Sequence, residues 1–228
     1  MNDNIIYSAA AWIIPLVIAI VFHEVAHGWV ASALGDPTAR SLNRLSLNPV
    51  RHVDPVGTIL VPMGLAIAHL PVFGWAKPVP VVASRLRNPR WDMVLVALAG
   101  PAMNLVLALA GALLLGTFLA GLQDGPADNL TLFAIRNLIN FIQINVFLAV
   151  FNLLPIPPFD GGHVVEGLLP RPLASKYGQI ARYAFPVMLF LLVILPTIVP
   201  AANVVQRVVG PPADALIRMF LNIASIPV

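Results

Sequence analysis

The sequence predicts an all-α membrane protein that crosses the bilayer several times. Of its 228 residues, 59% are hydrophobic and only 10% are charged, whereas a soluble domain carries about 25% charged residues. The mean hydropathy is +0.87, and apolar stretches of the roughly 20 residues that a membrane helix needs recur along the chain. The net charge is only +3, so the composition gives no reason to expect nucleic-acid binding.

Six apolar stretches account for the predicted helices, and four of them are long enough to be firm membrane spans. Residues 55–70 contain Gly57, Pro62 and Gly64 and are short for a span, so they predict a re-entrant or short segment. Residues 211–228 open with Pro-Pro-Ala-Asp and then run apolar, which predicts either an interfacial helix or a last short span. The four firm spans are predicted at residues 5–34, 91–122, 130–154 and about 180–199.

Charged residues between the spans predict the orientation of the chain. Arginine or lysine occurs in residues 36–54, 71–90 and 155–179, whereas residues 123–129 contain two aspartates and no basic residue. The positive-inside rule therefore predicts that the first three segments are cytoplasmic and that the fourth is external, with the N-terminus outside. This orientation requires residues 55–70 to enter and leave the membrane at the same face. Such a re-entrant segment is tolerated where neighbouring protein or a water-filled cavity provides hydrogen-bond partners for its backbone groups.

Two histidines four residues apart lie inside the first predicted span. His23 and His27 share one helix face, so both imidazoles can reach a single metal ion. Glu24 points elsewhere around the helix axis and is free to accept a proton from water. Ionisable side chains are costly inside hydrocarbon and are usually functional there. The pattern therefore predicts a metal site, about 27 Å along the helix from residue 5 and so near its cytoplasmic end.

A carboxylate after the third predicted span is the best candidate for a third ligand. Catalytic zinc sites usually have three protein ligands, and the chain has no cysteine. A metzincin-type third histidine is excluded because the corresponding residue is Ala33, and Glu166 is the only other glutamate. Asp160 lies in the sequence Asn-Leu-Leu-Pro-Ile-Pro-Pro-Phe-Asp-Gly-Gly. Its prolines and glycines turn the chain and can hold a carboxylate toward the bundle interior.

Several of these residues also have purely structural interpretations. Asp-Gly is a common turn pair, so Asp160 could serve only the turn. Asn104 is most simply an interhelical hydrogen-bonding residue, and Gly100 is interpreted as part of a helix-packing surface of small residues. His52 and Asp54 could form a second metal site, although an interfacial histidine is the simpler interpretation. The roles of His52, His69 and His163 stay open at this point.

Three motifs occur in a defined order along the chain. They are Phe-His-Glu-Val-Ala-His-Gly at residues 22–28, Ala-Gly-Pro-Ala-Met-Asn at residues 99–104, and Asn-Leu-Leu-Pro through Asp-Gly at residues 152–161. With the Phe-Gly-Trp-Ala-Lys-Pro-Val-Pro loop at residues 73–80, they span residues 22–162, about 60% of the chain. In this respect the sequence resembles the site-2 protease family of intramembrane zinc metalloproteases.

The resemblance implies a zinc metalloendopeptidase that hydrolyses peptide bonds within or near the transmembrane segments of single-span membrane proteins. It implies one Zn²⁺ per chain, with His23, His27 and Asp160 as ligands and Glu24 as general base. It also implies that Asn152 stands near the substrate carbonyl. No polar stretch of about 80 to 100 residues is present to form the PDZ domain of larger members, so the chain resembles a compact form.

We therefore expect a single membrane-embedded domain over residues 1–228, with a catalytic core at about 5–169 and C-terminal helices at 176–228. Its expected location is a prokaryotic-type cell membrane, with the active site toward the cytoplasm. An extended segment at residues 79–82 or 58–61 is expected to pair with an unwound substrate as an added strand. Substrate identity, cleavage trigger and oligomeric state are left undetermined.

Two other functions are compatible with the same residues. In a metal transporter, the histidines and acidic residues would line a permeation path, but the inverted repeats typical of transporters are not visible. In an inactive membrane scaffold, the fold would persist without catalysis. The presence of His23, Glu24, His27 and Asp160 together argues against that.

Overall fold

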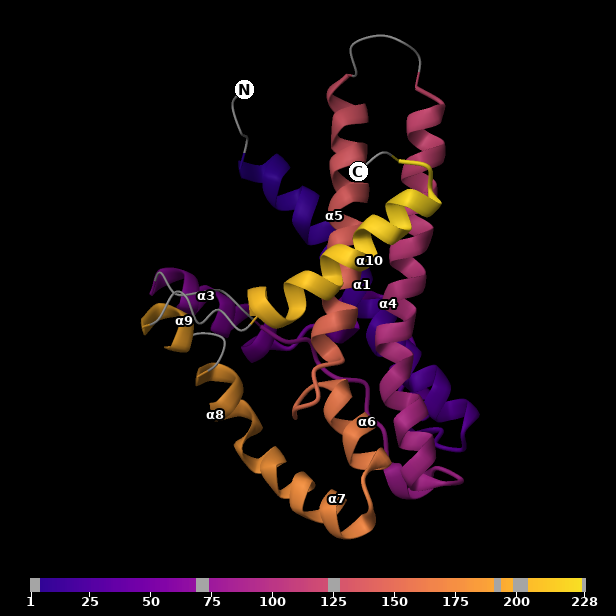
Figure 1. Ribbon diagram of the computed structural model, residues 1–228, viewed down its shortest axis with the longest axis vertical. Helices are drawn as coiled ribbons and strands as arrows, with labels where there is room; N and C mark the ends of the chain where they lie inside the picture. Colours follow the sequence, from indigo (N-terminus) through magenta and orange to yellow (C-terminus); the bar gives the residue numbers. More distant parts are fainter. Residues whose placement is uncertain (1–4, 69–73, 123–127, 191–193, 199–204, 227–228) are drawn as a thin grey trace.

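The computed structural model describes residues 5–68, 74–122, 128–190, 194–198 and 205–226, and within these residues it is helical without strands (Figure 1). Three helices are long and apolar enough to cross a membrane: α1 (Ile5–Ala33), α4 (Pro89–Ala120) and α5 (Asn129–Asn152). They match the first three predicted spans to within two residues at each end. The all-α prediction is thus confirmed for the described part of the chain.

These three helices form the centre of the molecule. Helix α4 runs antiparallel to α5, and α1 packs against both, so α1 and α5 run in the same general direction (Figure 1). Small side chains on α4, among them Ala108 and Ala112, are fully buried against Ile142 and Val146 of α5. Small residues allow two membrane helices to approach closely, and van der Waals contact then holds them together.

Shorter helical segments connect and flank the three long helices. Residues 58–61 fall within two of them, so the expectation of an extended segment there is wrong. Residues 79–82 have no helical structure. The shorter segments are α2 (Thr38–Ser41), η1 (Pro49–His52), η2 (Pro55–Leu60), α3 (Val61–Ile67), η3 (Ala83–Arg85), α6 (Asp160–Leu168), α7 (Arg171–Gly178), η4 (Gln179–Tyr183), α8 (Ala184–Leu189), α9 (Leu195–Ile198), η7 (Val205–Val209) and α10 (Gly210–Ile223).

The remaining predicted membrane segments take different forms. The segment at 55–70 is described to residue 68 and folds into η2 and α3, which are too short together to span. Helix α10 crosses α4 and α5 obliquely and buries Ala213 and Phe220 against them (Figure 1). The stretch at 180–199 contains η4, α8 and α9. Residues 191–193 and 199 of this stretch lie outside the described residues, so the fourth span stays a prediction. His69, Phe73 and Asp124 also lie outside the described residues.

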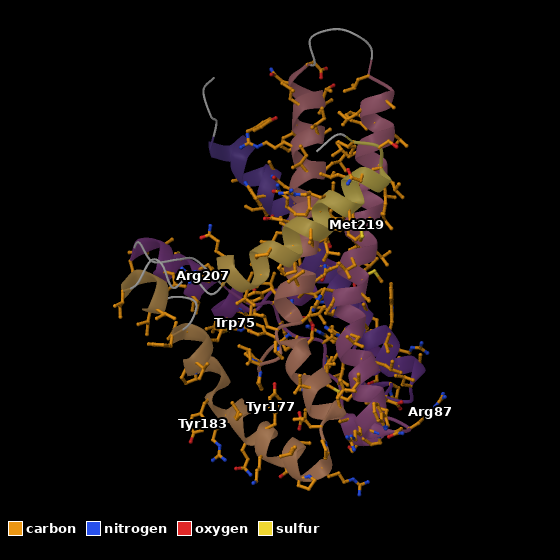
Figure 2. All side chains as sticks on the ribbon, in the orientation of Figure 1. Trp75, Arg87, Tyr177, Tyr183, Arg207 and Met219 are labelled. Atoms are coloured by element: carbon orange, nitrogen blue, oxygen red, sulfur yellow. The ribbon has the colours of Figure 1, made fainter. Side chains whose placement is uncertain are left out.

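One buried carboxylate ties the end of α1 to the chain near residue 80. Asp36 is fully buried and accepts hydrogen bonds from the backbone N–H and hydroxyl of Thr38 and from the Val82 N–H at 2.6 Å. Burial disfavours the charged form of Asp36, but these hydrogen bonds and the charge of Arg85 outweigh it and hold its pKa below the ordinary value. Arg87, labelled in Figure 2, donates to a carbonyl in the last turn of α1. The loop after α1 and the segment at 74–82 are thereby held together.

Candidate metal centre

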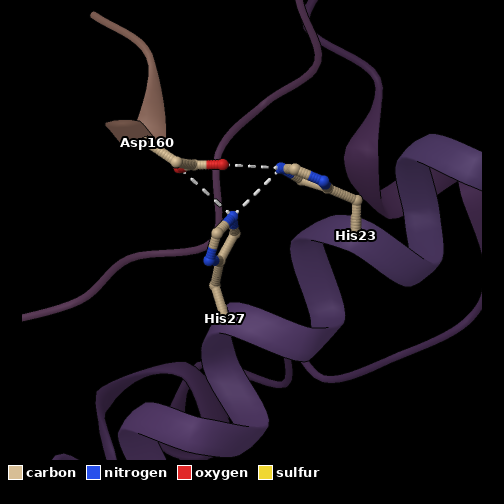
Figure 3. Close-up of side chains that lie close together, drawn as sticks. All are labelled: His23, His27 and Asp160. Carbon is tan, nitrogen blue, oxygen red and sulfur yellow. Dashed lines mark hydrogen bonds and ion pairs between the residues drawn. The ribbon is translucent and has the colours of Figure 1, made fainter. Parts of the chain in front are cut away.

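The side chains of His23, His27 and Asp160 converge at one point between α1 and the start of α6 (Figure 3). The two imidazole Nε2 atoms lie 3.1 Å apart. The carboxylate of Asp160 lies 3.2 Å from Nε2 of His23 through Oδ2 and 3.5 Å from Nε2 of His27 through Oδ1. Both histidines are buried, and Asp160 is largely so. The three residues named as candidate ligands are therefore brought together by the fold.

Hydrogen bonds on the far side of each ring fix which nitrogen faces the centre. Nδ1 of His27 lies 2.7 Å from the carbonyl oxygen of Val96, which can only accept, so Nδ1 carries the proton. Nδ1 of His23 lies 2.6 Å from Oδ1 of Asn104. The amide nitrogen of Asn104 donates to the Ala19 carbonyl and to Oδ1 of Asn145, so its oxygen must face His23. Each neutral imidazole thus presents a lone pair at Nε2.

Two lone pairs and a carboxylate aimed at one buried point repel one another unless a cation lies between them. Oδ2 of Asp160 is buried and has no hydrogen-bond partner among the described residues, as expected for an atom that awaits a ligand. Ligand atoms arranged tetrahedrally about 2.0–2.2 Å from zinc lie about 3.3–3.6 Å from one another. The observed separations of 3.1–3.5 Å are close to that geometry. The donor set and its spacing fit a zinc ion.

The turn after α5 presents Asp160 at the first residue of α6. A β-carbon on Gly161 would collide with the carbonyl oxygens of Leu153 and Leu154, so only glycine permits this chain path. At the other end of α6, the Arg90 guanidinium donates to the carbonyls of Gly167 and Leu169, which caps that helix end with a positive charge. Helix α6 is thereby held against α4 while its first residue faces the histidines.

Asp160 directs its carboxylate toward the two Nε2 atoms from the first residue of α6. An ionised carboxylate is the form that coordinates a divalent cation.

Glu24 lies next to His23 on α1, and its carboxylate makes a contact of its own. Its carboxylate is half-buried, and Oε2 accepts a hydrogen bond of 2.8 Å from the Val79 backbone N–H. The segment at 74–82, anchored at its far end by Asp36, therefore orients the glutamate. Oε2 of the carboxylate is engaged in this contact, and Oε1 has no hydrogen bond among the described residues.

Gly100 is a site residue that the sequence analysis assigned only to helix packing. A β-carbon there would lie 2.6 Å from Nε2 of His23 and in direct collision with Nε2 of His27. Helix α4 therefore approaches the two coordinating nitrogens at a residue with no side chain. The sequence shows a Gly-Pro pair within an apolar span. Such a glycine indicates that another group packs closely against the helix, but it does not identify that group.

Other candidate residues take part in different contacts. The Asn152 amide donates to the carbonyl of Leu148 in its own helix at 2.9 Å and, among the described residues, has no hydrogen bond to the three ligands. His52 is buried beside the Ser46 carbonyl at 2.7 Å, while Asp54 accepts N–H groups at the start of η2, so the pair does not share a contact. His163 lies 3.8 Å from Glu166, and the two side chains are 49% and 46% exposed.

Comparison with known proteins adds independent information. The model of peptidase family M50 matches residues 11–137 and 122–195. "Putative zinc metalloprotease YwhC" of Bacillus subtilis is 41% identical over 182 residues, which cover 79% of each chain. "Putative zinc metalloprotease Rip2" of Mycolicibacterium smegmatis is 32% identical over 194 residues, covering 85% of this chain and 67% of the relative. The Rip2 protein of Mycobacterium tuberculosis H37Rv is 30% identical over 198 residues, with coverage of 83% and 67%. No solved structure matches significantly.

Substitution of Gly100 by alanine tests the close approach of α4. The added methyl group would occupy the space beside both Nε2 atoms, so we expect Gly100→Ala to abolish metal retention, measured as zinc per chain in the purified protein. Gly64→Ala is the matched control, because a β-carbon at Gly64 meets nothing within 4 Å. Full zinc content in Gly100→Ala would contradict the geometry.

Asn104 is expected to act through the orientation of His23. Removing an outer hydrogen-bond partner of a metal-binding histidine typically costs 10–100-fold in metal affinity. Asn104→Leu should therefore weaken zinc binding by about that factor in a competition titration with a chelator. Asn140→Leu is the control, since Asn140 is also a buried asparagine but donates to the Ala11 carbonyl, away from the centre. Equal losses in both variants would indicate a general packing effect.

Proposed function

The chain belongs to peptidase family M50, and from this membership and the geometry of its metal centre we propose that it is an intramembrane zinc metalloendopeptidase whose zinc is held by His23, His27 and Asp160. The observation that carries this assignment is the convergence of two Nε2 lone pairs and a carboxylate within 3.1–3.5 Å. The proposed stoichiometry is one zinc ion per chain. The three apolar helices agree with an integral membrane protein.

The proposed reaction is hydrolysis of a peptide bond. Zinc bound at this centre would supply Lewis acidity, which lowers the pKa of a water molecule and polarises the substrate carbonyl. Glu24 accepts a proton from that water as its oxygen attacks the carbonyl carbon. Glu24 then returns the proton to the departing amide nitrogen as the C–N bond breaks. The products are a carboxylic acid and an amine, which ionise to a carboxylate and an ammonium group at neutral pH. The Val79 N–H keeps Glu24 oriented during both transfers.

Asn152 is proposed to stand near the substrate carbonyl and to donate a hydrogen bond to the oxygen that becomes negative. A donor of this kind is worth about 3 kcal/mol in other proteases. In the described structure its amide donates to Leu148, so this role requires the side chain to leave that bond. Its position at the last residue of α5, before the turn that carries Asp160, supports the proposal.

The proposed substrates are single-span membrane proteins whose helix unwinds near the centre. Of the two predicted pairing segments, residues 79–82 are the one without helical structure. The N–H groups of Val79 and Val82 are already bonded to Glu24 and Asp36, and Pro80 has none. Val81 therefore carries the one N–H in this segment with no hydrogen bond among the described residues. A substrate strand added at residues 79–82 would therefore bind mainly to the backbone carbonyl groups of this segment.

The proposed topology has four spans with the N-terminus outside and the metal centre toward the cytoplasm, in a prokaryotic-type cell membrane. It is supported by the arginines at 36–54 and by Lys77 and the arginines at 71–90. It is also supported by the common direction of α1 and α5, which brings the histidine pair and Asp160 to the same end (Figure 1). We propose one domain over residues 1–228, with a catalytic core at about 5–169 and C-terminal helices at 176–228.

The assignment is tested by separating metal binding from proteolysis. We expect Glu24→Gln to retain zinc while peptide cleavage by the purified protein falls at least about a hundredfold, the lower range of general acid–base contributions. Asp160→Asn should lose the metal as well as the activity. Glu166→Gln, the same chemical change at an exposed residue, is the control. Metal transport that is lost in Glu24→Gln, with no proteolysis in the wild type, would favour a transporter instead.

The topology is testable with single cysteines, because the chain has none of its own. Lys77 and Asp128 are both exposed and lie on opposite sides of α4 in the chain. A membrane-impermeant thiol reagent applied to oriented vesicles is expected to label Cys at 128 from the outer face and Cys at 77 only from the inner face. Labelling of both positions from one face would refute the proposed orientation.

A further inference from the structure

We propose that the loop between α1 and η2 binds the phosphate-containing headgroup of an anionic phospholipid. The loop borders an open surface hollow of about 230 Å³, here called the headgroup pocket, lined by Arg40, Asn43, Leu45, Ser46 and Arg51. It lies at the end of the molecule where α1 finishes and α2 begins. It is distinct from the metal centre and shares none of its ligands.

The pocket carries positive charge that the fold does not neutralise. One nitrogen of Arg51 donates to the Asn43 carbonyl at 2.8 Å, which fixes the guanidinium at the pocket wall. Among the described residues, no carboxylate lies within 4.0 Å of Arg40, Arg44 or Arg51. The acidic residues that flank the loop, Asp36 and Asp54, are occupied by other hydrogen bonds.

A third arginine supports the pocket from behind. Arg44 donates to the carbonyls of Arg51 and Lys77, the latter at 2.8 Å, and more weakly to Pro78 at 3.3 Å. Its buried Nε–H has no hydrogen-bond partner in the described part of the chain. A guanidinium satisfied by backbone carbonyls keeps its full charge, so it adds to the positive potential of the pocket.

The lining suits a phosphate diester. Arginine guanidinium groups bind phosphate oxygens through paired N–H donors, and Arg40 and Arg51 are both placed to do so. The Ser46 hydroxyl oxygen accepts the Asn48 N–H at 3.2 Å, which leaves its proton free to donate. Basic pockets next to membrane helices are typical sites for anionic lipid headgroups.

The surroundings favour a lipid over a free phosphate ion. Leu42, Leu47 and Val50 border the pocket in the sequence and are 59%, 46% and 75% exposed. A soluble anion would leave these side chains in water, whereas the acyl chains of a phospholipid would cover them. Leu45 adds an apolar wall within the pocket itself.

The pocket is also joined to the catalytic segment. Arg44 binds the carbonyls of Lys77 and Pro78, and the next residue, Val79, donates its N–H to Glu24. A headgroup bound by Arg40 and Arg51 would therefore restrict the motion of the loop between α1 and η2. Through Arg44, this loop holds the segment at 74–82, which orients Glu24. The binding site itself is independent of the proposed proteolytic function.

The test is lipid retention by the purified full chain in an uncharged detergent. Native mass spectrometry would compare phosphatidylglycerol with phosphatidylcholine, with inorganic phosphate and glycerol phosphate as separate competitors. We expect the wild-type protein to retain phosphatidylglycerol in preference to phosphatidylcholine. The double variant Arg40→Gln/Arg51→Gln should bind phosphatidylglycerol about thirtyfold more weakly, because it lacks two positive charges that attract the anionic headgroup. Arg171→Gln/Lys176→Gln, which removes the same charge from exposed positions on α7, should bind as wild type does.

Ser46→Asp provides a second variant that keeps both arginines and places a carboxylate in the pocket. It should lower phosphatidylglycerol retention as the double variant does, even if the latter folds poorly. Equal retention of the two lipids by wild type, or equal losses in the pocket and α7 variants, would overturn the proposal. If inorganic phosphate displaces the bound lipid as effectively as glycerol phosphate does, and binds as tightly as phosphatidylglycerol, the pocket is a site for free phosphate. That result would overturn the lipid assignment.

Discussion

The structure depends on the meeting of two imidazole nitrogens and a carboxylate inside an otherwise apolar helix bundle. His23 and Asp160 are separated by 137 positions in the chain, yet their side chains lie 3.2 Å apart. That contact requires α1 and α5 to run in the same direction and requires the turn after α5 to return toward α1. Repulsion among the three groups opposes this arrangement unless a cation occupies the centre, so metal binding and correct helix packing are coupled energetically.

Around this centre, the buried side chains of His23, His27 and Asn104 form hydrogen bonds with other helices. Asn104 links α4 to His23, to the Ala19 carbonyl and to Asn145 of α5 in one network. Buried amides without partners would destabilise the bundle, whereas a satisfied network fixes the relative rotation of three helices. The same hydrogen bonds that satisfy the asparagines therefore select the histidine tautomer needed for coordination.

Two non-helical segments complete the centre from outside the bundle. The turn before α6 positions Asp160, the first residue of that helix, and the segment at 74–82 holds Glu24 through the Val79 N–H. Asp36 fixes the far end of the latter segment, and Arg90 fixes the far end of α6. Contacts far from the metal centre therefore fix the positions of Asp160 and Glu24. These contacts hold the two side chains more rigidly than a surface loop would.

The sequence by itself determined the class of fold and the metal-binding helix. Apolar length predicts the three long helices because a bilayer requires about 20 apolar residues, and helical periodicity places His23 beside His27 because that spacing is local. The order of motifs also made Asp160 the leading third ligand.

Only the tertiary structure decided what faces these residues. Whether Gly100 packs against lipid, another helix or the imidazoles depends on the rotation of α4, and so do the partners of Asn104. The docking of α10 across α4 and α5, the Val79 contact to Glu24 and the position of the headgroup pocket likewise join residues far apart in the chain. Such contacts follow from how helices pack together, and helical periodicity carries no information about that packing.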